Sequence, residues 1–495
     1  MKVVYYPDEK EFGGCVARRC FLDIQTTLLN LPWSGNMKKS HIDELITIFG
    51  KEQVLTEPED MIAYSYDASH AETEPEAVVF ATTTEQISEL MKLAYREHIP
   101  VTPRGQGSGL SGGSVPLKKG IVLSMDKMQN VIDFDPANRL ITVEAGLTTS
   151  DIDSIAVEAN LFYPPDPGSV TFSTIGGNVA ENAGGLRGLK YGVTKDYVKM
   201  MKVVLPRGDI VTLGNKCVKH VAGFNMEGIF VGSEGLLGIM TEVTLALLPI
   251  PQHHESALAI FDSLKDAAQS VSDIIAAGVT PSTMEFMDNI TINAIQNFKD
   301  CGLPRDAEAV LLIETDGEKN SAVNEMAKVE EAVSKNNVLR FSRARDMVER
   351  DLLFAGRRIA LNALANVKPN LILEDATVMR SKLPEMVSGI VNIATKYDLQ
   401  VGIFGHAGDG NLHPTFLIDM KDKDEMARTE KAVSELFQLA IDLEGTISGE
   451  HGIGVEKKPF LENQIGAEGI RLLQNIKKTL DPENLLNPGK MFDMA

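Results

Sequence analysis

The spacing of apolar and polar residues divides the chain into two parts with different predicted architectures. Residues 75–250 alternate short apolar runs, for example 77–81 and 121–124, with helical segments and glycine-rich turns. Short apolar runs bounded by turn residues are typical of buried strands. From about residue 255, longer helical patterns alternate with strands, which predicts an α+β domain on an antiparallel sheet. Pro249 and Pro251 mark the boundary between the two parts.

The same patterns predict individual elements. The expected strands are 77–81, 121–124, 131–135, 140–144, 203–205, 210–212, 257–261, 309–314, 371–375, 401–404 and 412–417, and the segment 239–248 closes the first part. The expected helices are 84–95, 150–159, 262–278, 318–335, 382–397 and 423–444. Residues 1–36 show no clear period and lack the long apolar core of a secretory signal, so a poorly ordered extension is expected there.

Two histidines flank a turn near the C-terminus. His406 and His413 surround Asp409-Gly410, and Asp-Gly between apolar runs is a strong signal for a two-residue hairpin turn. Such a turn would place the two histidines directly opposite each other on one face, with their Cβ atoms about 5 Å apart. This spacing suits two imidazoles that bind one metal ion, although a histidine in a strand is more often a hydrogen-bonded structural residue.

A second polar segment, 448–454, contains Glu450 and His451 between glycines. Together with His406 and His413, Glu450 would complete a site of two imidazoles and one carboxylate. Three protein ligands leave coordination positions open, which is typical of a catalytic ion rather than a structural one. The alternative interpretation of Glu450 and His451 is a hydrogen-bonded turn, which spacing leaves open.

Four segments are rich in glycine and small polar residues. Residues 104–113 contain five glycines in ten positions, and similar segments occur at 173–188, 231–238 and 487–489. Glycines allow close backbone approach and let several N–H groups point at an anion such as a pyrophosphate. The first segment matches neither the dinucleotide-fold fingerprint nor a P-loop. A flexible surface loop is the alternative for one segment, but four of them indicate one elongated ligand.

Composition narrows the classes of partner. The net charge of −21 argues against binding to nucleic acid or to anionic membranes. The four cysteines show no paired metal or disulfide framework, and no apolar stretch approaches the length of a membrane span. A cytoplasmic protein with reduced cysteines is the expectation.

Seven motifs in a fixed order carry a family resemblance. They are Arg104-Gly-x-Gly-x-Gly, Pro164-Pro-Asp-Pro-Gly, Thr174-Ile-Gly-Gly-Asn with Asn182-Ala-Gly-Gly, Tyr191-Gly-Val-Thr, Gly232-Ser-Glu-Gly, Gly405-His-Ala-Gly-Asp-Gly-Asn-Leu-His and Ser448-Gly-Glu-His-Gly-Ile-Gly. From about Met37 to the C-terminus, the chain resembles the FAD-linked oxidases of the vanillyl-alcohol oxidase type. Within that family it is most similar to glycolate oxidase flavin subunits and D-lactate dehydrogenases.

The resemblance implies an α+β fold with a two-subdomain FAD-binding domain at 37–250, a cap or substrate domain on an antiparallel sheet at 251–445, and a C-terminal segment, 446–495, that returns to the flavin. By likeness, the pyrophosphate loop would supply Arg104, Gly105, Gln106, Gly107, Ser108, Gly109, Ser111 and Gly112. The flavin ring and ribityl chain would contact Pro165, Asp166, Ser169, Thr174, Gly177, Asn178, Asn182 and Gly184. The adenosine side would contact Glu234, Gly235 and Ile239, and Asn487 would close over the ring. Covalent members of the family carry a histidine in the first loop, where this chain has Gln106 and Ser108, so non-covalent FAD is expected.

The resemblance also implies oxidation of a small 2-hydroxy acid such as glycolate or D-lactate. A divalent ion, Zn or Mn, would be held by His406, His413 and Glu450. His451, expected to titrate near neutral pH, would be the base, and Arg357 would bind the substrate carboxylate, although a solvated helix face is the alternative for Arg357. Relatives acting on 2-hydroxyglutarate carry a lysine where this chain has 371–373, which favours a monocarboxylate.

Three functional hypotheses follow from these patterns. The first is a flavin-dependent 2-hydroxy-acid dehydrogenase that passes electrons to an electron-transfer flavoprotein, an iron–sulfur subunit or another acceptor. The second is a metal-dependent hydrolase that uses the His/His/Glu site and has no need of the glycine-rich half. The third is a non-catalytic flavin-fold subunit of a larger complex, which would have no need of the two histidine segments.

Overall fold

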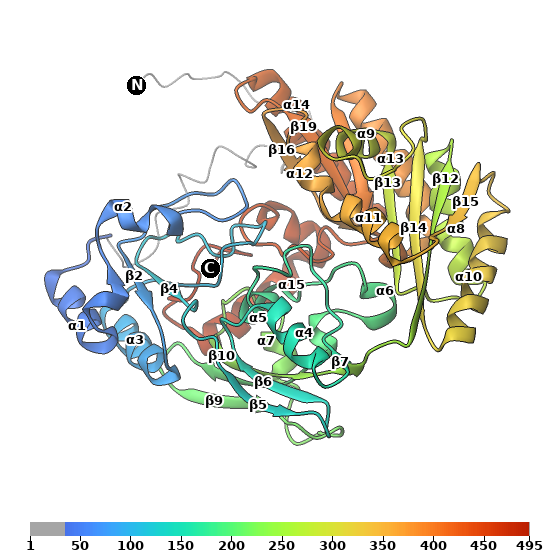
Figure 1. The fold of residues 1–495 in the computed structure, drawn as a ribbon. Helices are drawn as coiled ribbons and strands as arrows, with labels where there is room; N and C mark the ends of the chain where they lie inside the picture. Colours follow the sequence, from blue (N-terminus) through green and yellow to red (C-terminus); the bar gives the residue numbers. More distant parts are fainter. Residues whose placement is uncertain (1–34, 495) are drawn as a thin grey trace.

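The structure is a computed structural model that describes residues 35–494 (Figure 1). The extension expected at 1–36 therefore lies almost wholly outside the described residues. The described chain forms three main sheets with helices packed on them. The first two sheets lie before residue 250, and the third lies between residues 253 and 418.

Sheet A, the first sheet, has the strand order β1-β2-β4-β3 and is parallel except for β1. Its strands are β1 (Val54–Leu55), β2 (Ala77–Phe80), β3 (Val101–Arg104) and β4 (Ile121–Ser124). Two helices pack on it, α1 (Lys39–Phe49) and α3 (Thr84–Glu97). Thr83 caps the N-terminus of helix α3, because its side chain accepts a hydrogen bond from the Gln86 N–H. Strand β3 leads directly into the glycine-rich loop that follows Arg104.

Sheet B is antiparallel, with the order β5-β6-β10-β8-β9. Its strands are β5 (Val131–Asp135), β6 (Leu140–Glu144), β8 (Val198–Val204), β9 (Ile210–Gly214) and β10 (Ile239–Ala246). Helices α4 (Thr149–Val157) and α5 (Ile175–Glu181) bury their apolar residues against it. The short elements of this half are α2 (Pro58–Met61), β7 (Leu161–Phe162), α6 (Gly188–Tyr191), α7 (Glu227–Phe230) and β11 (Leu248–Pro249).

Sheet C is the large antiparallel sheet, with the order β15-β12-β14-β13-β18-β19-β16, and β17 pairs with β19. Its strands are β12 (His253–Phe261), β13 (Thr283–Asp288), β14 (Ala309–Gly317), β15 (Arg340–Arg343), β16 (Asn370–Leu373), β17 (Ala376–Thr377), β18 (Gln400–Gly405) and β19 (Asn411–Ile418). It stands apart from sheets A and B in yellow to orange colours (Figure 1).

Both faces of sheet C are covered by helices. Alternate residues of β14 face opposite sides: Leu311 and Ile313 join one core, while Val310 and Leu312 join the other. The first core contains α8 (Leu264–Ala276), α10 (Lys319–Val333), α13 (Leu383–Lys396) and α14 (Lys423–Asp442); the second contains α9 (Asn289–Phe298), α11 (Met347–Arg358) and α12 (Ala360–Leu364). Burial on both faces explains the continuous apolar runs of these strands.

The C-terminal segment returns to the first half of the molecule. Helix α15 (Lys458–Leu480) lies in dark red beside elements of the first half (Figure 1). The buried Lys477 ammonium donates to the carbonyls of Leu236 and Leu486 and pairs with Asp481. Because the chain then pairs beside β3 through Leu486, residue 487 is placed next to the first glycine-rich loop.

The α+β architecture with a separate antiparallel sheet is confirmed, but the predicted hairpin register is wrong. Phe404, not His406, pairs with His413, and residues 407–409 form a 3-10 turn. A two-residue type I′ turn needs positive φ at both central residues. Of the Asp409-Gly410 pair, only Gly410 adopts positive φ, at 80°. The connection is therefore longer, and His406 leaves the strand before the turn.

Candidate active site

The glycine-rich segments of the first half meet the C-terminal segment. The Asn487 amide donates hydrogen bonds to the carbonyls of Gly113 (3.1 Å) and Glu234 (2.7 Å). The Glu234 carboxylate accepts from the N–H groups of Ile453 and Gly454, both at 2.7 Å. Segments that are far apart in the sequence are thus held together around one region.

Glycine is required where these segments approach each other. A methyl group on Gly235 would lie 3.0 Å from the Asn487 amide nitrogen, and one on Gly105 would collide with the Thr174 hydroxyl. A methyl group on Gly184 would lie 2.7 Å from Oε2 of Glu450. The last contact is informative because Gly184 belongs to a glycine-rich segment and Glu450 belongs to the expected metal site.

Several buried polar atoms in these segments point to a polar ligand. The hydroxyls of Ser111, Ser173 and Ser233 and Oε2 of Glu181 are buried and have no hydrogen-bond partner within residues 35–494. Buried polar groups are nearly always paired in native proteins. The three serines come from three different glycine-rich segments. An elongated ligand with phosphate and hydroxyl groups, such as FAD, fits unpaired hydroxyls beside closely approaching backbone.

Some of the predicted cofactor residues are engaged with protein groups in this structure. The Asn178 amide donates to the Thr149 hydroxyl at 2.5 Å. The Asp166 carboxylate accepts from Arg358 at 3.1 Å. Ile239 lies in the hydrophobic core and is 2% exposed. Asn178, Asp166 and Ile239 therefore contact other protein groups in this structure and support the glycine-rich loops.

The first loop is anchored by its arginine. The buried Arg104 guanidinium donates to the carbonyls of Ala63 and Tyr66. Gln106 donates to Asp126, and Thr174 caps helix α5 by accepting from the Gly177 N–H. The other predicted contacts lie in three places. Gly107, Ser108, Gly109 and Gly112 lie in the loop after β3, Pro165 and Ser169 lie between β7 and α5, and Asn182 caps the C-terminus of α5.

The four residues predicted for the metal site and the base come together. Nε2 of His406 lies 3.0 Å from Oε1 of Glu450, and Nε2 of His413 lies 3.4 Å from the same oxygen. The two imidazole centroids are 5.2 Å apart. Ligands that surround one Zn²⁺ at 2.0–2.2 Å lie roughly 3.0–3.5 Å from one another. Both distances to Glu450 match this spacing, and the three donor atoms lie within 4.8 Å of one another, as one divalent ion requires. All three side chains are largely buried.

The carboxylates of Glu285 and Glu450 favour positive charge at His406. Burial lowers the pKa of the His406 imidazole, but the carboxylates of Glu285 and Glu450 outweigh burial and hold that pKa well above its usual value. Burial likewise raises the pKa of the Glu450 carboxyl, but His406 and its neighbours hold it well below its usual value. A carboxylate that stays ionised while buried is the type of ligand a metal ion needs.

His451 stacks on His413, with ring centroids 5.0 Å apart and an interplanar angle of 8°. Its Nε2 lies 4.0 Å from Oε1 of Glu450, so it borders the ligand cluster without belonging to the same three donor atoms. Burial lowers the pKa of His451 to about 4, so the near-neutral titration expected from the sequence is wrong. The imidazole is therefore neutral at physiological pH, with one ring nitrogen unprotonated.

Arg357 is buried, which removes the alternative of a solvated helix face. Its Nε donates to Oε2 of Glu285 at 2.5 Å, and its guanidinium lies 4.8 Å from the centroid of the Phe404 ring. Oε1 of Glu285 in turn lies 2.7 Å from Nδ1 of His406. A single buried carboxylate thus connects the arginine with one of the two histidines.

Sequence reasoning missed two buried acids, Glu285 and Asp375. Asp375 lies 3.8 Å from Nδ1 of His413 through Oδ1, and its Oδ2 accepts N–H groups of residues 449–451. A signal was present in the sequence: Glu285 stands between Met284 and Phe286, and Asp375 follows the apolar run 371–373 by two residues. Acidic residues are almost never fully buried unless they are paired.

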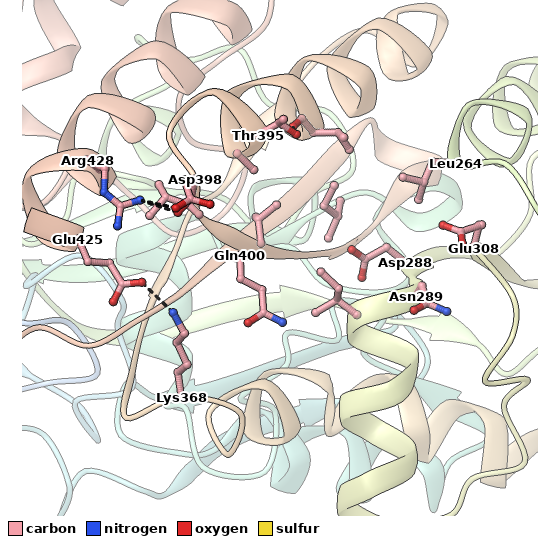
Figure 2. A pocket seen from close by; sticks show the side chains of 16 residues that line it. Leu264, Asp288, Asn289, Glu308, Lys368, Thr395, Asp398, Gln400, Glu425 and Arg428 are labelled. Atoms are coloured by element: carbon pink, nitrogen blue, oxygen red, sulfur yellow. Dashed lines mark hydrogen bonds and ion pairs between the residues drawn. The ribbon is translucent and has the colours of Figure 1, made fainter. Parts of the chain in front are cut away.

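A hollow of about 710 Å³ lies elsewhere, between β18 and helices α13 and α14 (Figure 2). Its rim carries the ion pairs Lys368–Glu425 and Arg428–Asp398. The described residues that line it include no histidine and no part of the glycine-rich segments. It is therefore separate from the site formed by His406, His413 and Glu450.

The combination of glycine-rich FAD-type loops with a separate antiparallel sheet defines a flavin-dependent oxidoreductase class. Two family descriptions match the chain: "FAD binding domain" over residues 75–214 and "FAD linked oxidases, C-terminal domain" over residues 250–491. The chain belongs to the FAD-linked oxidase family, and it is an FAD-binding enzyme.

Particular relatives narrow the comparison. The chain is 46% identical to "Glycolate oxidase subunit GlcD" of Bacillus subtilis (strain 168), over 91% of this chain and 96% of the relative. It is 34% identical to "D-lactate dehydrogenase" of Anaerostipes hadrus, over 86% of this chain and 91% of the relative. The solved structure of p-cresol methylhydroxylase with substrate bound shares the fold, with a TM-score of 0.77 at 18% identity, over 92% of this chain and 98% of that chain.

Within residues 35–494, no helix combines the length and apolar character needed to span a membrane.

Proposed function

We propose that this protein oxidises a small 2-hydroxy acid, of the glycolate or D-lactate type, to the 2-oxo acid with non-covalent FAD and a divalent ion, Zn or Mn. The names of its relatives support the substrate class. The observation that carries the proposal is the close approach of Gly184 to Glu450, where a methyl group on Gly184 would lie 2.7 Å from Oε2 of Glu450. With this spacing, the expected flavin side and the expected metal side would border one reaction space.

FAD, when bound, supplies the acceptor for the hydride, which carries away both electrons of the substrate Cα–H bond. A divalent ion, when bound, supplies a Lewis acid for the hydroxyl and carboxylate oxygens. His406, His413 and Glu450 would hold that ion. His451 would accept the hydroxyl proton at a ring nitrogen, and its stacking on His413 fixes the ring orientation. Thus the proton and the hydride leave the substrate toward different acceptors.

Arg357 would bind the substrate carboxylate. Its Nε is used by Glu285, and a guanidinium has further N–H donors on its terminal nitrogens. Leu371 and Leu373 pack on the same core of sheet C as Phe354 of the arginine's own helix. Because leucines at 371 and 373 cannot pair with a second carboxylate, we expect a monocarboxylate substrate rather than a dicarboxylate. The cap domain assigned to 251–445, between the FAD-binding domain at 37–250 and the returning segment at 446–495, would supply this carboxylate-binding part.

The reduced flavin needs an electron acceptor. We propose a protein acceptor, an electron-transfer flavoprotein or an iron–sulfur subunit, because the relative from Bacillus subtilis is itself named as a subunit. Two of the four cysteines have described surroundings: Cys217 is exposed and Cys301 is buried, each as a free thiol. Neither residue belongs to a cluster of potential metal ligands among the described residues.

The test is anaerobic mixing of the yellow holoprotein with a panel of D- and L-2-hydroxy acids, followed by the flavin absorbance. We expect bleaching with glycolate or D-lactate, loss of bleaching after treatment with a chelator, and recovery with added Zn²⁺ or Mn²⁺. Bleaching at full rate in metal-free protein would disprove the role of the ion. An absence of bleaching with every acid of the panel would disprove the proposed substrate class.

A further inference from the structure

Two buried carboxylates lie behind the metal-binding histidines without belonging to the His406–His413–Glu450 set. Glu285 comes from β13, in the middle of sheet C, and is 0% exposed. Asp375 comes from the link between β16 and β17 and is also 0% exposed. Fully buried acids are rare in proteins, so each of these two needs a specific partner.

Glu285 contacts His406 from the side that faces away from Glu450. Its Oε1 lies 2.7 Å from Nδ1 of His406, while Nε2 of the same ring lies 3.0 Å from Glu450. A carboxylate beside Nδ1 accepts a hydrogen bond from the Nδ1–H group and leaves Nε2 unprotonated for the ion. The second oxygen of Glu285 accepts from Arg357, so the carboxylate is held from two sides and has little freedom to rotate.

Asp375 occupies the corresponding position behind His413. Its Oδ1 lies 3.8 Å from Nδ1 of His413, and among the described residues neither atom has a hydrogen-bond partner. A closer approach of about 0.6 Å or more would turn this pair of unsatisfied buried atoms into an Nδ1–H to carboxylate hydrogen bond. Nε2 of His413 faces Glu450 at 3.4 Å. Both histidines therefore present the same nitrogen to the same oxygen.

The other oxygen of Asp375 organises the turn that carries Glu450 and His451. Oδ2 accepts the backbone N–H groups of residues 449, 450 and 451, at 2.8, 2.9 and 2.9 Å. It also accepts from the Ser448 hydroxyl at 2.9 Å. Three consecutive N–H groups directed at one oxygen fix the backbone of the turn, and thereby the direction of both side chains.

We propose that Glu285 and Asp375 are positioning residues that hold His406 and His413 as Nδ1–H tautomers, with both Nε2 atoms directed at a single divalent ion. Asp375 also folds the turn that presents Glu450 to that ion. The inference deepens the proposed function, because it depends on a metal ion at the His/His/Glu site. On this proposal, Glu285 and Asp375 are not ligands themselves, but they determine how accurately the three ligands are positioned.

The charges around Asp375 favour one ion over two. Asp375, His413 and His451 also bring three donor atoms close together, which would suit a second ion. However, the Lys457 ammonium lies 3.4 Å from Oδ2 of Asp375. A lysine cation and three N–H dipoles already compensate that carboxylate, so a second divalent cation would meet like charge. One equivalent of metal per chain is expected.

The test compares Glu285→Gln and Asp375→Asn with a control, Glu314→Gln, in the full-length holoprotein. Glu314 is a buried acid of the same sheet that pairs with Arg350 and His254, and it has no hydrogen bond or ion pair with His406 or His413 among the described residues. Replacing groups behind metal ligands weakens metal binding about 10–100-fold. We expect that loss of Zn²⁺ or Mn²⁺ affinity in both test variants, with retained FAD, and an unchanged affinity in the control. Conservative variants, Glu285→Asp and Asp375→Glu, are expected to recover part of the affinity.

The outcomes separate the two levels of the proposal. Equal metal affinity in test and control variants would overturn the positioning role, even if the wild type is a metal-dependent oxidase. Two equivalents of metal per wild-type chain would overturn the single-ion assignment. A wild type that binds one ion tightly but bleaches with no hydroxy acid would disprove the proposed function, while the affinity series would still decide the positioning role. If a variant fails to fold, its conservative partner supplies the comparison.

Discussion

The contact between Gly184 and Glu450 predicts a specific effect of Gly184→Ala. Gly184 does not have positive φ, so alanine is compatible with the backbone. The new methyl group would lie 2.7 Å from Oε2 of Glu450 and 3.4 Å from its Cβ. An ordinary contact is about 3.4 Å, so the carboxylate oxygen must move by about 0.7 Å. Metal–ligand distances tolerate only about ±0.2 Å.

The size of the effect follows from the side-chain cost of that movement. A rotation of roughly 30° away from a preferred rotamer costs about 0.5–1.5 kcal/mol, and 1.4 kcal/mol corresponds to a tenfold change in an equilibrium constant. We therefore expect Gly184→Ala to weaken Zn²⁺ or Mn²⁺ binding by about 2- to 12-fold. Gly168→Ala is the matched control, because a methyl group at Gly168 meets no atom within 4 Å.

The assay is a competitive metal titration of both variants, together with the FAD content per chain. Gly184→Ala is expected to retain FAD, bind metal more weakly than Gly168→Ala, and regain flavin reduction at high metal concentration. Equal metal affinity in the two variants would refute the reasoning. Loss of FAD with intact metal binding would also refute it, because the methyl group would then act on the flavin side alone.

Two further predictions concern proton transfer and stability. His451→Ala is expected to keep FAD and metal but to lower the single-turnover rate of flavin reduction about 10²–10⁴-fold, and an unchanged rate would exclude His451 as the base. The pKa of Glu314 is lowered to about 2: burial raises it, but hydrogen bonds from His254 and Arg350 and the charge of Arg350 outweigh burial. Because the pKa is lower in the folded state, the ionised carboxylate stabilises the fold at pH values above the unfolded pKa of about 4.3. This stabilisation is lost as the pH falls toward 2. Glu314→Gln should therefore lower the free energy of unfolding at pH 7 by roughly 3 kcal/mol. In unfolding experiments the difference between wild type and variant should shrink below pH 4.5. A difference that does not depend on pH would contradict this prediction.

The site shows how far residue patterns reach. His406, His413, Glu450 and His451 were identifiable because unusual residue types occur between glycines in two short segments. The hairpin register was not identifiable from the sequence. An Asp-Gly pair predicts a turn, but it does not determine whether one or both residues adopt positive φ. In the structure only Gly410 does so, and the two rings still meet at 5.2 Å by another route.

The burial of Arg357 is a second feature that the sequence alone did not determine. Its place near the end of a helix is readable from the sequence, but its burial is not, because an arginine in an amphipathic helix is usually solvated. Glu285, 72 residues away in the chain, decides the matter by accepting from its Nε. The same acid contacts His406 across 121 residues.

The sequence by itself determined the elements and the residue types of this protein. Apolar periodicity places the strands and helices, because burial of apolar side chains depends on local spacing. Glycine-rich loops and paired histidines indicate which chemistry the chain is able to carry. Tertiary structure alone decided which groups meet: Gly184 with Glu450, Glu285 with His406, and Asp375 with the turn at 448–451. Such contacts join segments that are distant in the chain, and their partners are set by the packing of whole sheets rather than by any local pattern.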